Sequence, residues 1–173
     1  MRFTLLTLTC FFFFTCTPEP ETVQVKNFTL EVPPGISYDK NQDGNKLITF
    51  SNGSKLKLFI EDGIGGVVRP GRVADQYEAT GVEEFTFDHL YDGYYKTYKG
   101  TERFAAEAET INGSRYRRRR FNATVNGDTE IYFELGLLMV DTRYYTIINS
   151  GLRAEEADYA DAVEELIGSI RAK

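Results

Sequence analysis

Side chains suited to nucleophilic or metal chemistry are scarce in this chain. Its 173 residues include two cysteines, Cys10 and Cys16, and a single histidine, His89. Because both cysteines precede residue 17, the rest of the chain has no thiol for catalysis, for a disulfide or for a cysteine-rich zinc site. No serine is set in the Gly-x-Ser-x-Gly pattern of a hydrolase nucleophile, and His89 has no recognisable catalytic relay. We therefore expect a protein that is not an enzyme and carries no cofactor.

Cys16 is placed where a cysteine can carry a lipid. Met1 and Arg2 are followed by the almost wholly apolar run Phe3–Phe14, which has no charge. The run is shorter than the roughly 20 residues that a membrane-spanning helix needs. After Cys16 the chain turns polar at once, with two prolines and two glutamates in Thr17–Glu21. This pattern predicts a secretory signal that is removed from the mature protein.

The cysteine at this boundary resembles the acylated cysteine of bacterial lipoproteins. The resemblance implies a signal peptide over residues 1–15, a fatty-acyl anchor such as palmitate on Cys16, and an acidic tether over residues 16–21. It places the chain in the cell envelope, at the periplasmic or surface face of an outer membrane, and the tether is similar to those of surface-exported lipoproteins of the Bacteroidetes. Acylation of Cys10 is the alternative, but it would leave Phe11–Phe14 exposed on the mature tether.

The segment 85–99 is rich in aromatic residues and is the predicted partner surface. Tyrosine is enriched at protein interfaces and can stack on sugars or peptides, although such residues can also cover the edge of a core. The predicted partner-binding side chains are Tyr91, Tyr94, Tyr95 and Tyr98. Nearby carboxylates keep open an alternative from another class, an envelope hydrolase that would use Glu83, Glu84 or Asp88.

A third candidate function rests on the run Asp39–Gly44. It matches the first half of a calcium loop, in which Asp39, Asn41 and Asp43 would supply oxygen ligands. The twelfth position of that loop is Phe50 instead of the bidentate glutamate that calcium needs. We expect a polar turn here, and cation or small-ligand binding stays an alternative.

The four consecutive arginines Arg117–Arg120 could grip phosphates or an acidic partner. Because side chains alternate along a strand, they would instead divide between the two faces of a sheet. We expect a ladder of cross-strand ion pairs, each contributing roughly 0.2–1 kcal/mol. The predicted pairs are Glu109 with Arg117, Glu107 with Arg119 and Glu134 with Arg120.

Three Asn-Gly dipeptides, at Asn52, Asn112 and Asn126, predict the tight turns of antiparallel hairpins. Pairing apolar residues with apolar residues favours three-residue loops, because a one-residue slip reverses the faces of a strand. The predicted pairs are Phe121 with Phe133 and Ala123 with Ile131 at Asn126, Phe50 with Leu56 at Asn52, and Met139 with Tyr145 across a loop at Asp141–Arg143.

The remaining elements follow from hydrophobic periodicity. The strand Ile131–Met139 alternates like a strand with one buried face, and the residues 85–99 read as a loop with at most one strand. The predicted strands and helices are strands at Val23–Val32 and Glu107–Ile111, a helix at Arg72–Glu84 and a long terminal helix at Arg153–Ala172.

This order of elements resembles the PsbP-like α/β/α sandwich. The resemblance is carried by Phe28–Gly35, Ile111–Gly113, the strands Arg115–Val125 and Ile131–Val140, Tyr144–Ile148 and the helix end Glu164–Ile170. It implies an α+β fold, with an antiparallel sheet flanked by helices, in one domain over residues 22–173. Proteins with this fold are mostly non-enzymatic binding modules, although a fold alone does not fix a function.

The composition is that of a folded, acidic domain. A 42% apolar fraction is enough for a folded core. The chain has 20 basic and 26 acidic residues, and loss of Arg2 with the signal leaves 19 against 26, a net charge of −7. An acidic surface disfavours nucleic-acid binding, which depends on attraction to phosphates. We therefore expect an envelope lipoprotein that is held at the membrane by its lipid and binds a protein partner.

Overall fold

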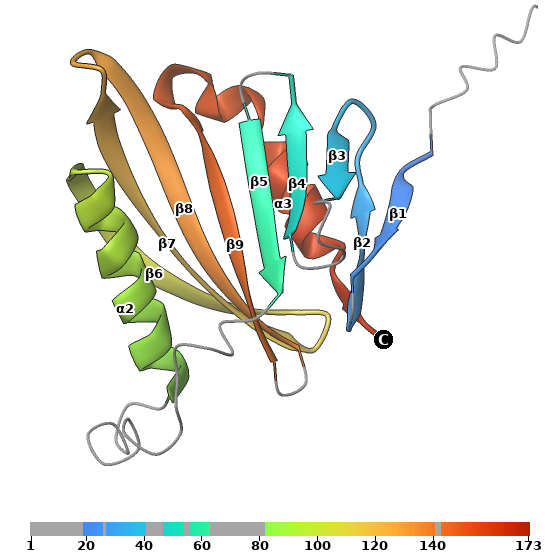
Figure 1. Ribbon diagram of the computed structural model, residues 1–173. Helices are drawn as coiled ribbons and strands as arrows, with labels where there is room; N and C mark the ends of the chain where they lie inside the picture. The colour runs from blue at the N-terminus through green and yellow to red at the C-terminus, as the bar shows by residue number, and fades with distance from the viewer. Residues whose placement is uncertain (1–18, 26, 41–46, 54–55, 63–81, 141–142) are drawn as a thin grey trace, which may run out of the picture.

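The computed structural model describes residues 19–25, 27–40, 47–53, 56–62, 82–140 and 143–173. Cys10, Cys16, Asn41, Asp43 and most of the predicted helix at 72–84 lie outside these residues. In chain order the elements are β1 (Glu21–Gln24), β2 (Phe28–Val32), β3 (Ser37–Lys40), β4 (Leu47–Asn52), β5 (Leu56–Asp62), α2 (Val82–Thr97), β6 (Gly100–Ile111), β7 (Ser114–Val125), β8 (Thr129–Val140), β9 (Arg143–Leu152), the 3-10 helix η1 (Arg153–Asp158), α3 (Ala160–Gly168) and β10 (Arg171–Ala172) (Figure 1).

The described strands form two antiparallel sheets. Seven strands make a large sheet in the order β3-β4-β5-β9-β8-β7-β6, and β1-β2-β10 make a small one. Helix α2 packs on one face of the large sheet, whereas α3 and the small sheet cover the other (Figure 1). This α+β sandwich is the predicted fold class.

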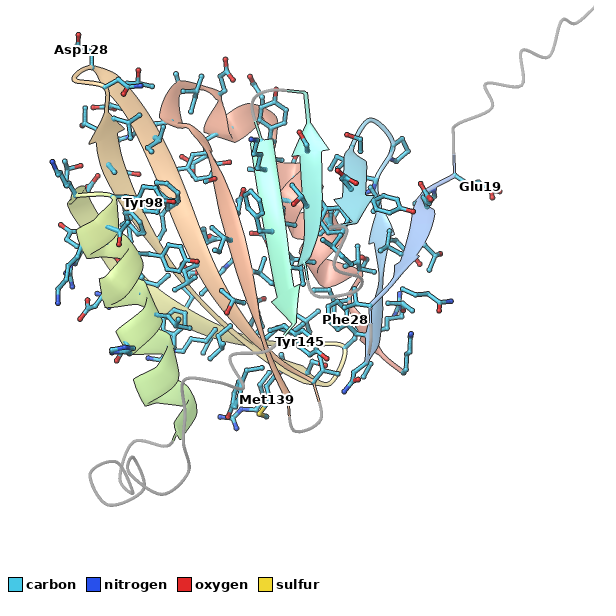
Figure 2. The ribbon with its side chains drawn as sticks, in the orientation of Figure 1. Glu19, Phe28, Tyr98, Asp128, Met139 and Tyr145 are labelled. Atoms are coloured by element: carbon cyan, nitrogen blue, oxygen red, sulfur yellow. The ribbon has the colours of Figure 1, made fainter. Side chains whose placement is uncertain are left out.

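Two apolar clusters fill the layers on either side of the large sheet. The larger one joins the small sheet and α3 to the sheet, and within it the rings of Phe28 and Tyr145 meet edge to face at 4.9 Å (Figure 2). The smaller one joins α2 to the sheet around Tyr91 and Phe121. Strand β8 is consequently buried on both faces, which corrects the expectation of one solvated face.

The Asn126 hairpin confirms the register predicted from the sequence. Phe121 pairs with Phe133 and Ala123 with Ile131 across β7 and β8. Asn126 and Gly127 have φ values of 51° and 89°, in the left-handed region that Asn-Gly tolerates.

The Asn52 hairpin is shifted by two residues from its predicted register, because Phe50 pairs with Leu58 and not with Leu56. A shift of two residues keeps every side chain on its own face, so apolar pairing cannot detect it.

Two other turns differ from prediction by one residue. The Asn112 loop has two residues, so Glu107 pairs with Arg118 and Glu109 with Tyr116; the predicted pairs Glu107–Arg119 and Glu109–Arg117 are wrong. Between β8 and β9, Met139 pairs with Tyr144 and not with Tyr145. Strand β8 is apolar on both faces, so apolar pairing hardly distinguishes the two registers, although Leu137 pairs with Thr146 in the observed one.

Three helix and strand assignments are corrected. Residues 85–97, predicted as a loop, belong to helix α2, which begins at Val82 inside the predicted helix 72–84. Aromatic residues four positions apart pack this helix on the sheet. The terminal helix Arg153–Ala172 is divided into η1, α3 and β10. The segment Val23–Val32 is a hairpin of β1 and β2, not one strand, and Glu107–Ile111 is the end of the longer β6.

Candidate partner-binding surface

The buried face of α2 is an aromatic stripe laid over a row of arginines. Phe87, Tyr91 and Tyr95 follow one another at four-residue spacing, so they share one helix face, and neighbouring rings lie stacked 6.2–6.5 Å apart. On the sheet below, Arg117 lies 5.2 Å from the ring centre of Phe87 and Arg119 lies 4.3 Å from that of Tyr91. Such cation–π contacts let charged residues of β7 sit beneath a helix.

Arg103 of β6 completes the row of arginines. Its guanidinium lies 3.9 Å from the ring centre of Tyr95, and it forms a 3.0 Å ion pair with Asp92 of α2. Arg103, Arg117 and Arg119 therefore contact the buried face of α2 and hold it on the sheet, although the side chain of Arg103 stays 40% exposed. Arg117 and Arg119 lie on the same face of the sheet as Phe121, because side chains alternate along β7.

Tyr91 belongs to this internal layer. Its side chain is wholly buried, and its hydroxyl donates a 3.0 Å hydrogen bond to the carbonyl oxygen of Arg120. Burial raises the pKa of the Tyr91 hydroxyl, and the nearby Arg119 opposes that shift. Of the tyrosines predicted for partner binding, Tyr91 therefore serves the core.

A second stripe on α2 borders an open groove. Leu90, Tyr94 and Tyr98 again follow four-residue spacing, and they line a cavity of about 300 Å³ together with His89, Gly93 and Thr97. The rings of Tyr94 and Tyr98 are nearly parallel, with centres 6.3 Å apart. Tyr98 is 38% exposed and lies where the helix meets the sheet (Figure 2).

The sheet continues the apolar character of this groove. The Tyr98 ring centre lies 4.3 Å from that of Phe133 on β8. Phe59 and Ile131, both partly buried, and Ile148 pack in the same cluster as Leu90 and Tyr94. We call the cavity lined by His89, Leu90, Gly93, Tyr94, Thr97 and Tyr98 the α2 groove. Tyr94 and Tyr98 were predicted from their residue type, whereas Leu90, Gly93 and Thr97 were missed because a helix was not expected there.

Arg118 and Arg120 point to the opposite face of the sheet. The Nε atom of Arg118 lies 3.0 Å from Oε2 of Glu107 and 3.7 Å from Oε1 of Glu109. The same guanidinium also forms an ion pair with Glu164 of α3. Arg120 pairs with Glu156 of η1. A ladder of ion pairs is therefore present, but it is built on Arg118 and Arg120 and ties the sheet to η1 and α3.

Glu134 of β8 lies among these charges, opposite Arg120. Burial raises the pKa of its carboxyl to about 6, because the lowering effect of Arg118 does not offset the desolvation. Glu164 and Glu107 add to the rise.

The residues of the alternative functions lie in two separate elements, α2 and β3, as far as the structure describes them. Asp88 and His89 are exposed on α2, and Asp39 lies in β3. Glu83 and Glu84 lie in the first turn of α2. Among the residues that the structure describes, no group of histidine, cysteine or acidic side chains is arranged to hold a metal ion. In the same residues, no helix is long and apolar enough to cross a membrane.

Comparison with solved structures identifies the fold as PsbP-like. Neither a protein-family model nor a curated protein sequence matches this chain. Cyanobacterial PsbP (CyanoP) from Synechocystis aligns with a TM-score of 0.61 at 11% identity, covering 90% of this chain and 93% of that one.

Two further structures share this fold. LpqN of Mycobacterium tuberculosis, described as involved in cell envelope biogenesis, gives a TM-score of 0.54 at 12% identity, over 88% of this chain and 90% of its own. The Ran-binding protein Mog1p of Saccharomyces cerevisiae gives a TM-score of 0.52 at 12% identity, and the alignment covers 88% of this chain and 95% of Mog1p. At these identities the likeness establishes the fold alone.

Proposed function

We propose that this chain is a membrane-anchored envelope lipoprotein whose domain is a non-catalytic module that binds a protein partner through the α2 groove. The observation that carries the proposal is the exposed Tyr98 beside parallel Tyr94 over an apolar sheet surface. Exposed aromatic side chains next to a preformed apolar groove are the usual anchors of protein interfaces.

The fold supports this class of function. The structures that share it include a protein of cell envelope biogenesis and a protein that binds Ran. The described residues that line the groove include no carboxylate, lysine or arginine, and the nearby arginines contact the buried face of α2. An uncharged, aromatic groove suits an apolar peptide segment of a partner better than an ionic substrate.

The proposed domain organisation is a signal peptide over 1–15, a tether over 16–21 and one PsbP-like domain over 22–173. Strand β1 begins at Glu21, at the end of the proposed tether. Thr17–Pro20 would then link Cys16 to the first strand as an extended, solvated segment.

Substitutions at Gly93 test the groove with little effect on the fold. A Cβ at Gly93, which lines the groove, would meet no atom within 4 Å, so the position has room for a side chain and Gly93→Trp should obstruct the groove. Gly93→Ala, the matched control, should stabilise α2 by about 0.5–1 kcal/mol and leave the groove open. A photo-crosslinking amino acid at Tyr98 should form an adduct with the partner, and the same group at Glu165 of α3 should not. Adducts at both positions, or an adduct that survives Gly93→Trp, would exclude the groove as the binding surface.

Cysteine variants test the anchor separately. Cells fed an alkyne analogue of palmitate should label the wild type and Cys10→Ala, whereas Cys16→Ala should remain unlabelled and be released from membranes. Label that depends on Cys10 would move the acylation site, and an unlabelled wild type would rule out the lipoprotein proposal.

A further inference from the structure

A second surface, separate from the α2 groove, lies at the edge of the large sheet. Strand β6 is the last strand in the sheet order, and no described strand pairs with its outer side. Its pairing with β7 is irregular near Gly100 and Arg103 but regular from Ala106 to Ile111. The residues Ala105–Thr110 are all exposed. A regular, exposed edge offers unpaired backbone groups to another strand.

The Asn112 hairpin determines which backbone groups point outward. Asn112 and Gly113 have φ values of 47° and 87°, as a two-residue type I′ turn requires, and Ile111 pairs with Ser114 beside them. In such a hairpin the flanking pair exchanges both hydrogen bonds, and the bonded positions then alternate along the strand. The N–H and C=O groups that point away from β7 are therefore those of Ala106, Ala108 and Thr110.

The two faces beside this edge differ in charge and size. On the face shared with α3, Glu107, Glu109 and Glu164 are 68%, 44% and 55% exposed, and all three contact the single guanidinium of Arg118. Three carboxylates around one arginine leave an excess negative charge at the edge. On the other face, Ala106 and Ala108 leave room for larger side chains of an added strand.

We propose that the edge of β6 over Ala106–Ile111 binds an extended, basic segment of a partner protein as an eighth strand of the sheet. Lysine or arginine at alternate positions of that segment would face Glu107 and Glu109, and β-branched residues between them would cover the alanines. A second copy of this chain would bring Glu107 and Glu109 against the same acidic residues. Its own tether, Thr17–Glu21, is acidic as well.

Three short peptides test strand addition by fluorescence anisotropy. The basic probe is Thr-Lys-Val-Lys-Val-Lys-Thr, the second probe replaces each lysine by glutamate, and the third replaces one valine of the basic probe by proline. The basic probe should bind with saturation. The acidic and proline probes should bind at least about tenfold more weakly, because one reverses the charges and the other removes a ladder donor.

Ala108 variants test the same contact from the protein side. Ala108→Pro removes an outward N–H that β7 does not use, so binding of the basic probe should weaken about tenfold, whereas Ala108→Val should bind like the wild type. Circular dichroism checks that both variants fold, and the proline probe gives an independent answer if they do not.

Equal binding of the basic and proline probes to the wild type would overturn strand addition. So would a wild-type dimer whose amide protection covers Ala106–Thr110, which would identify a second copy as the occupant. Gly93→Trp should leave this binding unchanged, so the two surfaces can fail separately.

Discussion

Glu134 shows how one carboxyl can work against the stability of its own fold. Its side chain lies between Arg118 and Arg120, yet burial raises its pKa from 4.5 to about 6. The folded protein therefore holds this proton more tightly than the unfolded chain. The contribution of Glu134 to the free energy of unfolding is therefore fully present below pH 4.5 and is lost as the pH rises through about 6.

We expect Glu134→Gln to remove this pH dependence. The variant should be more stable than the wild type at pH 7.5, by about 1–2 kcal/mol, because no charge is left to desolvate. Urea unfolding between pH 4 and pH 7.5 measures the difference. Glu130→Gln, on the same strand but 63% exposed, is the matched control and should keep the slope of the wild type. The same slope in Glu134→Gln would show that another group titrates.

The ring of Tyr116 occupies the space that a side chain at Gly136 would need. A Cβ at Gly136 would be 2.3 Å from the Tyr116 hydroxyl oxygen and 2.5 Å from Cε2. Tyr116 is buried and cannot swing into solvent. We expect Gly136→Ala to lower the free energy of unfolding by roughly 1–3 kcal/mol.

The control for this substitution is Gly168→Ala at the end of α3, where a Cβ would meet no atom within 4 Å. The clash should also depend on Tyr116, so the cost of Gly136→Ala should shrink when Tyr116→Leu is already present. Additive costs in urea unfolding would show that the two positions act independently.

At the scale of elements, the Asn112 turn joins the β6–β7 hairpin to the end of α3. The Asn112 side-chain amide donates hydrogen bonds of 2.9 Å to the carbonyl of Gly168 and 2.8 Å to that of Ile170. Carbonyls at a helix C-terminus lack partners within the helix, so this contact caps α3.

We expect Asn112→Ala to cost about 1–3 kcal/mol, because it loses the cap and strains a positive φ. Asn112→Gly keeps the turn and loses only the cap, so it should cost less. Urea unfolding gives both values, and amide exchange should be faster at the end of α3 in each variant. Wild-type exchange in Asn112→Gly would show that the cap contributes nothing.

The elements also show what could be read from the sequence. The Asn126 register was predictable, because the flanking residues of β7 and β8 allow only one pairing that joins apolar side chains. Residues 85–97 of α2 were not predicted as helix, because Gly93 and the many aromatic residues there are poor helix formers. The four-residue spacing of Phe87, Tyr91 and Tyr95 was the signal that could have found it. Without the helix, only the tyrosines of the α2 groove could be predicted, and not Leu90 beside them.

At the scale of the whole molecule, one sheet separates two cores. No described residue of α2 belongs to the cluster beneath α3 and the small sheet. Helix α2 should therefore be able to loosen while the rest stays folded.

We expect Tyr91→Ala to increase amide exchange across α2 and to leave β4 and β5 protected, because it opens a cavity only in the smaller core. Hydrogen exchange by mass spectrometry resolves these segments. The matched variant Leu166→Ala, in the larger core, should loosen α3 instead. Uniform faster exchange in Tyr91→Ala would show that the two cores unfold as one unit.

The positions of β1 and α2 have a consequence for how the protein would face a membrane. The two elements lie on opposite flanks of the large sheet (Figure 1). Under the proposed anchor at Cys16, a tether of six residues could reach at most about 20 Å, so the domain would stay within about its own breadth of the lipid surface. Because β1 and α2 lie on opposite flanks, the α2 groove would be far from the point where the proposed tether enters the domain. The proposed tether would therefore limit the distance between the domain and the lipid and leave the groove open to a partner from the aqueous side.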